Sequence, residues 1–219
     1  MESLADRVAA CERCGLARTR RQAVAGDDVS GAPLLLIAAA PSFAGELVGR
    51  ALSDEAREVL AKAGVDVAAS AATTLVKCRP PAGRAPTDEE IAACRPYLEE
   101  QVAEQRPETV IALGAGVLRA LAPAAPPFAS CHGHVRPATI GDRELRLLPV
   151  LDPYAVAEVP SLAPLLAADL GVAPPPPPAP APEPLAAREP SEEPTTTDRE
   201  PEPAPAVAAP EPPPQLGLF

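Results

Sequence analysis

The sequence has no apolar segment long enough to cross a membrane. Its longest apolar run, residues 32–41, is about half as long as a membrane-spanning helix of ~20 residues. The first eleven residues carry charged side chains where a signal peptide has an apolar stretch. We therefore expect a cytoplasmic protein without a membrane partner.

The sequence also lacks net positive charge, since 19 Lys and Arg face 30 Asp and Glu and the formal charge is −11. Such a balance normally argues against nucleic acid as a partner, because phosphate contacts need local positive charge. The acidity is unevenly distributed: residues 173–219 hold 17 of the 32 prolines and a charge of −6, which leaves −5 for the rest. The total therefore does not exclude a basic surface elsewhere on the chain.

Composition divides the chain into three segments. Residues 1–172 are long enough for one ordinary domain. Residues 173–214 are rich in Pro, Ala and Glu and cannot bury enough apolar surface to offset the entropy of ordering. We predict that they form a disordered linker, which leads to an apolar peptide at residues 215–219.

The body alternates between predicted strands and predicted helices. Short apolar or β-branched runs predict four strands, at residues 34–40, 72–77, 110–113 and 145–150. Helical spacing and capping residues predict helices at residues 2–10, 53–63, 87–105, 115–121 and 161–170. This order favours a three-layer α/β/α fold around a central, mainly parallel, four-stranded sheet. Ligands of such sheets bind beyond the carboxyl ends of the strands, here at residues 39–49, 77–84 and 151–154.

Four of the five cysteines have a spacing that suits metal ligation. Cys11 and Cys14 form a Cys-x-x-Cys pair, and 15 residues separate Cys78 from Cys94. In a chain without an export signal, such cysteines favour metal or redox chemistry over disulfides. Four thiolates can hold a tetrahedral zinc ion or a four-iron cluster, and spacing alone does not choose between them. The alternative is an incidental pair plus two small buried residues.

The fifth cysteine, Cys131, lies in a Cys-His-Gly-His segment with His132 and His134. It could join the two imidazoles as a metal ligand. We favour a partly buried free thiol beside loop histidines.

Four blocks of sequence carry a family resemblance. They are Cys-Glu-Arg-Cys-Gly-Leu at residues 11–16, Val-Lys-Cys-Arg-Pro-Pro-Ala-Gly-Arg-Ala-Pro at 76–86, Glu-Ile-Ala-Ala-Cys-Arg-Pro-Tyr-Leu at 90–98 and Ile-Ala-Leu-Gly at 111–114. Together they resemble the type 4, or iron–sulfur, uracil-DNA glycosylases over about residues 4–154. The resemblance implies an α/β sheet fold, DNA as a partner, and a [4Fe-4S] cluster rather than zinc on the four spaced cysteines. In that family the cluster braces DNA-contacting loops and takes no part in the chemistry.

Basic residues are frequent beside these cysteines. The two cysteine segments contain Arg13, Arg18, Arg20, Arg21, Lys77, Arg79 and Arg84. One metal centre would bring both segments together, which favours a phosphate-binding patch over the alternative of a solvated charged face. The residues that we expect to contact DNA are Arg13, Arg18, Lys77, Arg79 and Arg84. We expect the body to be monomeric and associated with the nucleoid.

The segment after the first predicted strand departs from the family at its catalytic acid. The family reads Gly-Glu-Ala-Pro-Gly there, and its acid serves the attacking water, whereas this chain has Ala39 at that position, followed by Pro41 and Ser42 in the base pocket. An alanine cannot act as a general base. The family's Phe, which stacks on uracil, aligns with Leu47. Glu46 is a nearby acid that could substitute for the missing one.

Two further catalytic positions differ from the family. The family's Asn pairs with the uracil edge, and Thr74 at its position has only one hydroxyl and a shorter reach. The family's His-Pro is Asp152-Pro153 here, and an ionised carboxylate would repel the oxyanion that an imidazole stabilises. Asp152 could instead stabilise a sugar cation or position water.

These features together predict a DNA-binding repair protein in which uracil excision is lost or altered. The alternative is an active glycosylase that hydrolyses the N-glycosidic bond of uracil or another damaged base with the help of Asp152 or Glu46. A third class is a protein–protein scaffold whose cluster only stabilises the fold.

The last five residues resemble the bacterial sliding-clamp-binding motif, Gln-Leu-x-Leu-Phe. An apolar patch at the tip of a disordered chain has no core of its own to join, so a partner's pocket explains it best. The resemblance implies that Gln215 bonds the pocket rim, Leu216 packs at its edge, and Leu218 with Phe219 fills its apolar clefts. The linker would then tether the body to the clamp. The alternative is a solubilising tail with an apolar end.

Overall fold

The computed structural model describes residues 2–29 and 31–171, which alternate between strands and helices. The strands are β1 (Leu34–Ala38), β2 (Ala71–Thr74), β3 (Thr109–Leu113), β4 (Arg136–Ile140) and β5 (Arg143–Val150). The helices are α1 (Leu4–Ala9), α2 (Phe43–Val48), α3 (Asp54–Lys62), α4 (Asp88–Gln105), α5 (Ala115–Leu121), α6 (Pro153–Glu158) and α7 (Ala163–Asp169). None of these helices has the length and hydropathy needed to cross a bilayer. The predicted linker at 173–214 and the terminal peptide at 215–219 lie outside the described residues.

The five strands form one sheet in the order β2-β1-β3-β5-β4. β1 pairs in parallel with both β2 and β3, and β3 pairs in parallel with β5. The predicted α/β fold with a mainly parallel sheet is confirmed. The predicted count of four strands is wrong, because β4 adds a fifth strand that pairs antiparallel to β5 at the edge of the sheet.

β4 has a sequence, Arg-Pro-Ala-Thr-Ile, that contains no apolar run. It lies at the sheet edge and fully buries only Ile140. Pro137 is tolerated there because one side of an edge strand needs no ladder partner for its amides. The signal that would have found this strand is the Gly141-Asp142 turn, where Gly141 has a left-handed φ of 58° between two extended segments.

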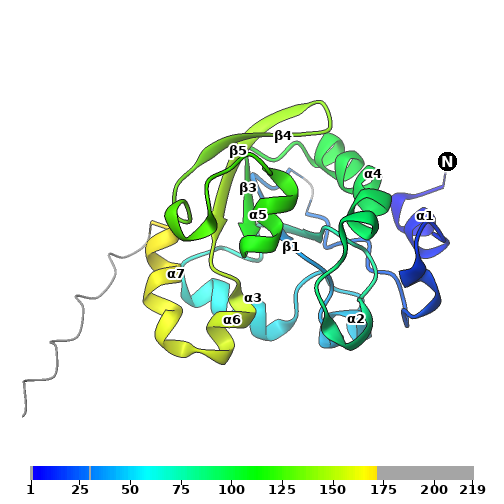
Figure 1. Ribbon diagram of the computed structural model, residues 1–219, viewed down its shortest axis with the longest axis horizontal. Helices are drawn as coiled ribbons and strands as arrows, with labels where there is room; N and C mark the ends of the chain where they lie inside the picture. Colours follow the sequence, from blue (N-terminus) through cyan, green and yellow to red (C-terminus); the bar gives the residue numbers. More distant parts are fainter. Residues whose placement is uncertain (1, 30, 172–219) are drawn as a thin grey trace, which may run out of the picture. The chain divides into compact units, whose positions relative to one another are not determined.

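Helices cover both faces of the sheet, as buried parallel strands require. Along β1, Leu35 and Ile37 pack in the same core cluster as residues of α4 and α5. The alternate residues Leu36 and Ala38 pack with residues of α3, α6 and α7. Figure 1 shows α3, α6 and α7 grouped together, with α4 and α5 set apart from them. The side-chain alternation of the strands therefore produces the three layers.

Capping residues start the helices that surround the strand ends. Ser53 caps α3, and Thr87 forms a capping box at the start of α4, as the sequence predicts. The sequence did not predict α2 and α6, which begin shortly after β1 and β5. Ser42 and Asp152 cap these two helices. The segments that follow β1 and β5 are thereby ordered at the carboxyl edge of the sheet.

Candidate functional site

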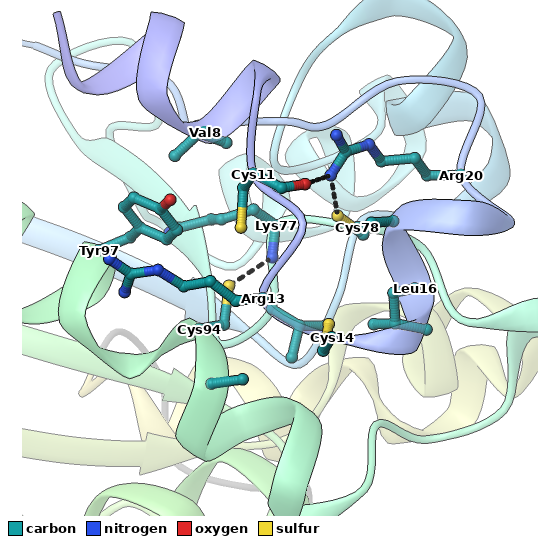
Figure 2. A pocket seen from close by; sticks show the side chains of 13 residues that line it. Val8, Cys11, Arg13, Cys14, Leu16, Arg20, Lys77, Cys78, Cys94 and Tyr97 are labelled. Carbon is teal, nitrogen blue, oxygen red and sulfur yellow. Dashed lines mark hydrogen bonds between the residues drawn. The ribbon is translucent and has the colours of Figure 1, made fainter.

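Four cysteines from three parts of the chain line one cavity (Figure 2). Cys11 and Cys14 come from the segment after α1, Cys78 follows β2, and Cys94 lies in the second turn of α4. The apolar walls of the cavity include Val8, Leu16, Val76 and Tyr97. The fold thus brings together the four cysteines whose spacing in the sequence suggests metal ligation.

Nitrogen donors lie against two of the sulfurs. Arg20 Nη1 donates to Cys78 Sγ at 3.3 Å and to the Cys11 carbonyl at 2.8 Å, and the Lys77 amide donates to Cys94 Sγ at 3.2 Å. Burial raises the pKa of the Cys94 thiol to about 11, and burial also raises the pKa of Cys78, against the effect of Arg20. These donors can stabilise the sulfurs once a metal has displaced their protons. Within residues 2–29 and 31–171, no three Cys, His, Asp or Glu side chains lie close enough together to hold a single metal ion.

Cys131 is buried in the main core, away from this cavity. Its Sγ lies 3.4 Å from the Pro126 carbonyl, to which it donates. The neighbouring His132 is engaged elsewhere, because its Nδ1 lies 2.7 Å from the Asp169 carboxylate and its ring stacks on Phe128. The structure therefore separates Cys131 from the four spaced cysteines.

A cleft of about 440 Å³ lies beyond the carboxyl ends of β1 and β5. Its lining includes four of the pocket and catalytic residues that the sequence suggests, namely Ala39, Pro41, Ser42 and Asp152. Phe43 and Tyr154 also line the cleft, although no sequence pattern assigned them a role. Phe43 directly follows Ser42, and Tyr154 lies two residues after Asp152. Their closeness to predicted site residues is the sequence signal that could have found them.

Three residues that the sequence placed in the site do not line the cleft. Thr74 is fully buried, and its hydroxyl donates to the Val76 carbonyl at 2.8 Å, so the prediction of a base-pocket role is wrong for this residue. Leu47 lies on the exposed surface of α2 and is not among the residues that line the cleft, so its place in a base pocket stays a prediction. Glu46 is buried and accepts a hydrogen bond from the Arg21 amide at 2.9 Å, so it does not replace the missing acid.

Two arginines lie over the exposed ring of Phe43. The Arg21 and Arg79 guanidinium carbons are 5.7 Å and 5.3 Å from the ring centroid, within the range of cation–π attraction. Phe43 remains 52% exposed, although it is one of only five aromatic residues in the chain. The ring and the Arg79 side chain both line the cleft.

The other predicted DNA-binding residues differ in their environments. Arg18 is exposed, and Arg13 lies over the Tyr97 ring at 4.8 Å beside the cysteine cavity. Arg84 makes two hydrogen bonds to the Glu90 carboxylate, at 2.6 Å and 2.8 Å, which offset much of its charge. Arg18, Arg13 and Arg79 therefore have cationic groups available near the surface.

Lys77 is the exception among the predicted basic residues, because it is only 1% exposed. Its ammonium donates to the hydroxyl of Thr73, the carbonyl of Thr74 and the side-chain oxygen of Gln101. Burial lowers its pKa to about 7. The prediction that Lys77 contacts DNA is therefore wrong: the residue joins the end of β2 to α4.

Asp152 is held at the cleft by its own backbone and by a close glycine. Its Oδ1 accepts a hydrogen bond from the Tyr154 amide at 3.0 Å, and burial raises the pKa of its carboxyl. Gly114 has a φ of 91°, and a Cβ at that position would lie 3.2 Å from the Asp152 Cβ. Only glycine fits this contact without strain.

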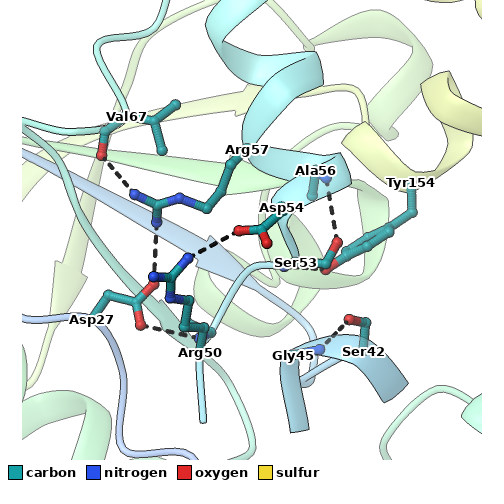
Figure 3. Close-up of polar contacts among 11 residues, drawn as sticks. Asp27, Ser42, Gly45, Arg50, Ser53, Asp54, Ala56, Arg57, Val67 and Tyr154 are labelled. Atoms are coloured by element: carbon teal, nitrogen blue, oxygen red, sulfur yellow. Dashed lines mark hydrogen bonds and ion pairs between the residues drawn. The ribbon is translucent and has the colours of Figure 1, made fainter. Parts of the chain in front are cut away.

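The Tyr154 wall of the cleft is tied to the segment before α3 (Figure 3). The Tyr154 hydroxyl accepts a hydrogen bond from the Ser53 amide at 3.2 Å. Nearby, Arg57 pairs with Asp27 at 3.3 Å, and Asp27 also accepts from the Ala51 amide at 3.4 Å. These contacts fix the chain between α2 and α3 against the sheet.

Gly114→Ala should destabilise the protein by about 1–3 kcal/mol, because it forces a strained φ and a close contact with Asp152. Gly116→Ala is the matched control, since a Cβ there meets nothing within 4 Å and alanine favours the helix. Denaturant unfolding of both variants measures the difference. Equal stability of the two variants would contradict the role given to Gly114.

Asp152→Asn removes a charge and keeps an oxygen that can cap α6. Because burial raises the Asp152 pKa in the folded state, the folded protein binds more protons than the unfolded chain between the two pKa values. The unfolding free energy of the wild type should therefore fall as pH rises through that window, and the variant should escape this loss. Unfolding measured from about pH 3 to about pH 7 tests it, and a constant difference between the two proteins would contradict it.

Comparisons with known proteins agree with this fold. The family described as the uracil DNA glycosylase superfamily matches residues 26–173. Type-4 uracil-DNA glycosylases are similar to this chain: 37% identical over 123 residues in Saccharolobus solfataricus, 33% over 118 in Pyrobaculum aerophilum and 32% over 122 in Thermotoga maritima. The matches cover 52%, 52% and 54% of this chain and 55%, 60% and 64% of those relatives, so the chain spans about three-fifths of their length. The chain belongs to the uracil DNA glycosylase superfamily.

Proposed function

We propose that this protein binds DNA in repair and that its ability to excise uracil is lost or altered. The observation that carries the proposal is the cleft itself: Ala39 and Asp152 both line it. The resemblance to the type 4 family implies a catalytic acid at the first of these positions and a histidine at the second. The relatives at 32–37% identity are uracil-DNA glycosylases, which supports DNA as the partner of this surface. The protein would act in the cytoplasm, at the nucleoid, as a monomer.

The chemistry of excision explains why these two positions matter. A glycosylase takes the base out of the stack, grips its polar edge and stabilises a sugar cation while water attacks. The Ala39 methyl group cannot hold or deprotonate that water. The Asp152 carboxylate accepts hydrogen bonds when ionised, so it cannot donate one to an oxyanion that forms on uracil. The family's route to uracil therefore lacks two of its groups.

The alternative function is an active glycosylase with a changed base pocket, which hydrolyses the N-glycosidic bond of uracil or another damaged base. Asp152 supports it, because this carboxylate lines the cleft and could stabilise a sugar cation or position water. Glu46 gives it no support, since its carboxylate bonds the Arg21 amide.

Uracil release tests the two functions against each other. The purified protein, loaded with iron and sulfide, should release no more uracil from single- or double-stranded DNA than a Cys78→Ala variant does. Release above that control would contradict the loss of uracil excision. A panel of lesion-bearing oligonucleotides extends the test, and release of another base that disappears in Asp152→Asn would establish the alternative.

We also propose that Cys11, Cys14, Cys78 and Cys94 hold a [4Fe-4S] cluster. The four cysteines line one cavity, and four thiolates can hold such a cluster. The resemblance to the iron–sulfur uracil-DNA glycosylases favours the cluster over zinc. Bound there, the cluster would cross-link three parts of the chain and act as a structural brace.

Iron analysis tests the cysteine assignment. Cys78→Ser should lower the iron content and the visible absorbance of the purified protein to near background, because one of four ligands is changed. Cys131→Ala is the matched control, since Cys131 is also buried but lies outside the cavity, and it should keep both. Zinc in place of iron in the wild-type protein, or equal iron loss in both variants, would contradict the proposal.

We further propose that the C-terminal peptide binds the bacterial sliding clamp. Residues 173–214 would act as the tether, with a reach on the order of 100 Å when extended. A tether of this length raises the concentration of the body near clamp-loaded DNA without rigid docking.

Binding of the full chain to purified clamp tests the tether. Leu218→Ala combined with Phe219→Ala should weaken binding at least about tenfold, because both apolar anchors are lost. Leu185→Ala, within the linker, is the control and should bind like the wild type. Equal affinity of the double variant and the wild type would rule the motif out.

A further inference from the structure

The cleft contains a half-exposed aromatic ring with two neighbouring cations, neither of which pairs with a carboxylate among the described residues. Phe43 lies beneath the Arg21 and Arg79 guanidinium groups. Within the described part of the chain, neither arginine forms an ion pair, in contrast to Arg84, which pairs with Glu90. An exposed ring that borders a cleft and is flanked by unpaired positive charge fits a base with phosphates on either side.

Phe43 differs from the other exposed apolar residues of α2 because it lines the cleft. Leu47 and Val48 are also exposed on α2, at 48% and 64%, yet neither lines the cleft. Phe43 remains 52% exposed with the two guanidinium carbons 5.7 Å and 5.3 Å from its centroid. A base that stacks on the exposed part of the ring would therefore have both cations beside its phosphates. The aromatic function that Leu47 cannot supply is thereby available from a different position.

Asp152 supplies a hydrogen-bond acceptor in the same cleft. Its Oδ1 accepts from the Tyr154 amide, and its Oδ2 has no hydrogen-bond partner among the residues that the structure describes. Ala39, Ala40 and Pro41 add only apolar side-chain atoms to the lining. An ionised carboxylate needs N–H donors from whatever occupies the cleft.

The acceptor discriminates between classes of base. Cytosine and adenine present an exocyclic amino group, and a carboxylate is a known partner of the cytosine amino group. Uracil presents a single N–H between two carbonyl oxygens, both of which repel a carboxylate. Asp152 therefore favours a base with an amino group over uracil.

We propose that the cleft binds an unstacked base that carries an exocyclic amino group, with its ring against Phe43 and its amino group donating to Asp152. The inference rests on the proposed binding of DNA and adds the class of base. It assigns Phe43 to affinity and Asp152 to base selection.

Two single-stranded oligonucleotides of equal length, oligo-deoxycytidine and oligo-deoxyuridine, test the proposal because they carry the same charge and differ in the amino group. Fluorescence anisotropy with the full-length protein should give at least about tenfold tighter binding of the cytidine strand, as expected for one hydrogen bond to a charged group. Asp152→Asn should bring that ratio close to one, because an amide both donates and accepts. Phe43→Ala should weaken binding of both strands about tenfold and leave the ratio unchanged.

Control variants separate stacking from folding and from charge. Phe43→Trp should restore the affinity lost in Phe43→Ala, and Val48→Ala, on the exposed surface of α2, should bind like the wild type. Thermal unfolding of each variant checks that the fold is intact. Equal binding of the two strands by the wild type, an unchanged ratio in Asp152→Asn, or wild-type affinity in Phe43→Ala would overturn the inference.

Salt dependence distinguishes the failure of this inference from the failure of the proposed function. Affinity that falls with added salt but ignores the base and Phe43 would leave DNA binding intact and overturn only the base class. No salt-sensitive binding to either strand would overturn both.

Discussion

The parallel pairing of β1 with β2 determines where both candidate sites lie. Register places Ala38, the last residue of β1, opposite Thr74, the last residue of β2, so the chain leaves both strands at the same edge of the sheet. Four residues beyond β2, Cys78 lines the cysteine cavity, and the next residue, Arg79, lines the cleft. Two consecutive residues therefore belong to two different sites. Any contact that orders the segment after β2 orders part of the cysteine cavity and part of the cleft together.

Because the cavity and the cleft share this segment, the proposed cluster could position cleft residues without taking part in catalysis. A metal centre that holds Cys78 would restrain Arg79, and Arg79 in turn lies over Phe43 at 5.3 Å. Lys77 contributes from the other side, since its buried ammonium bonds the Gln101 side chain of α4. The segment after β2 is thus held by the core on one flank, and the proposed cluster would hold it on the other. The basic and aromatic groups of the cleft would gain their positions from that restraint.

Local patterns predicted much of the fold and part of the site. Apolar runs found four strands, and the capping residues Ser53 and Thr87 found the starts of α3 and α4, because these signals depend on neighbours in sequence. β4 was missed because an edge strand needs few apolar residues. The placement of Asp152 at the cleft followed from the strand order, since ligand sites lie beyond the carboxyl ends of parallel strands.

The sequence could not predict in which direction the side chains of the site point. Lys77 lies in a block that resembles the family, and Thr74 lies two residues before that block. The fold turns both side chains inward, where they bond backbone and buried polar groups. The sequence did not predict a binding role for Phe43. That role depends on the contact of its ring with Arg21, which is distant along the chain.

Hydrogen–deuterium exchange of the full chain with and without single-stranded DNA tests the central claim most directly, which is that the edge beyond β1, β2 and β5 is the DNA-binding surface. The account predicts that added protection falls on residues 39–48, 77–86 and 151–154, with little change in β4 and α7. Protection confined to other segments, or none at saturating DNA, would contradict it.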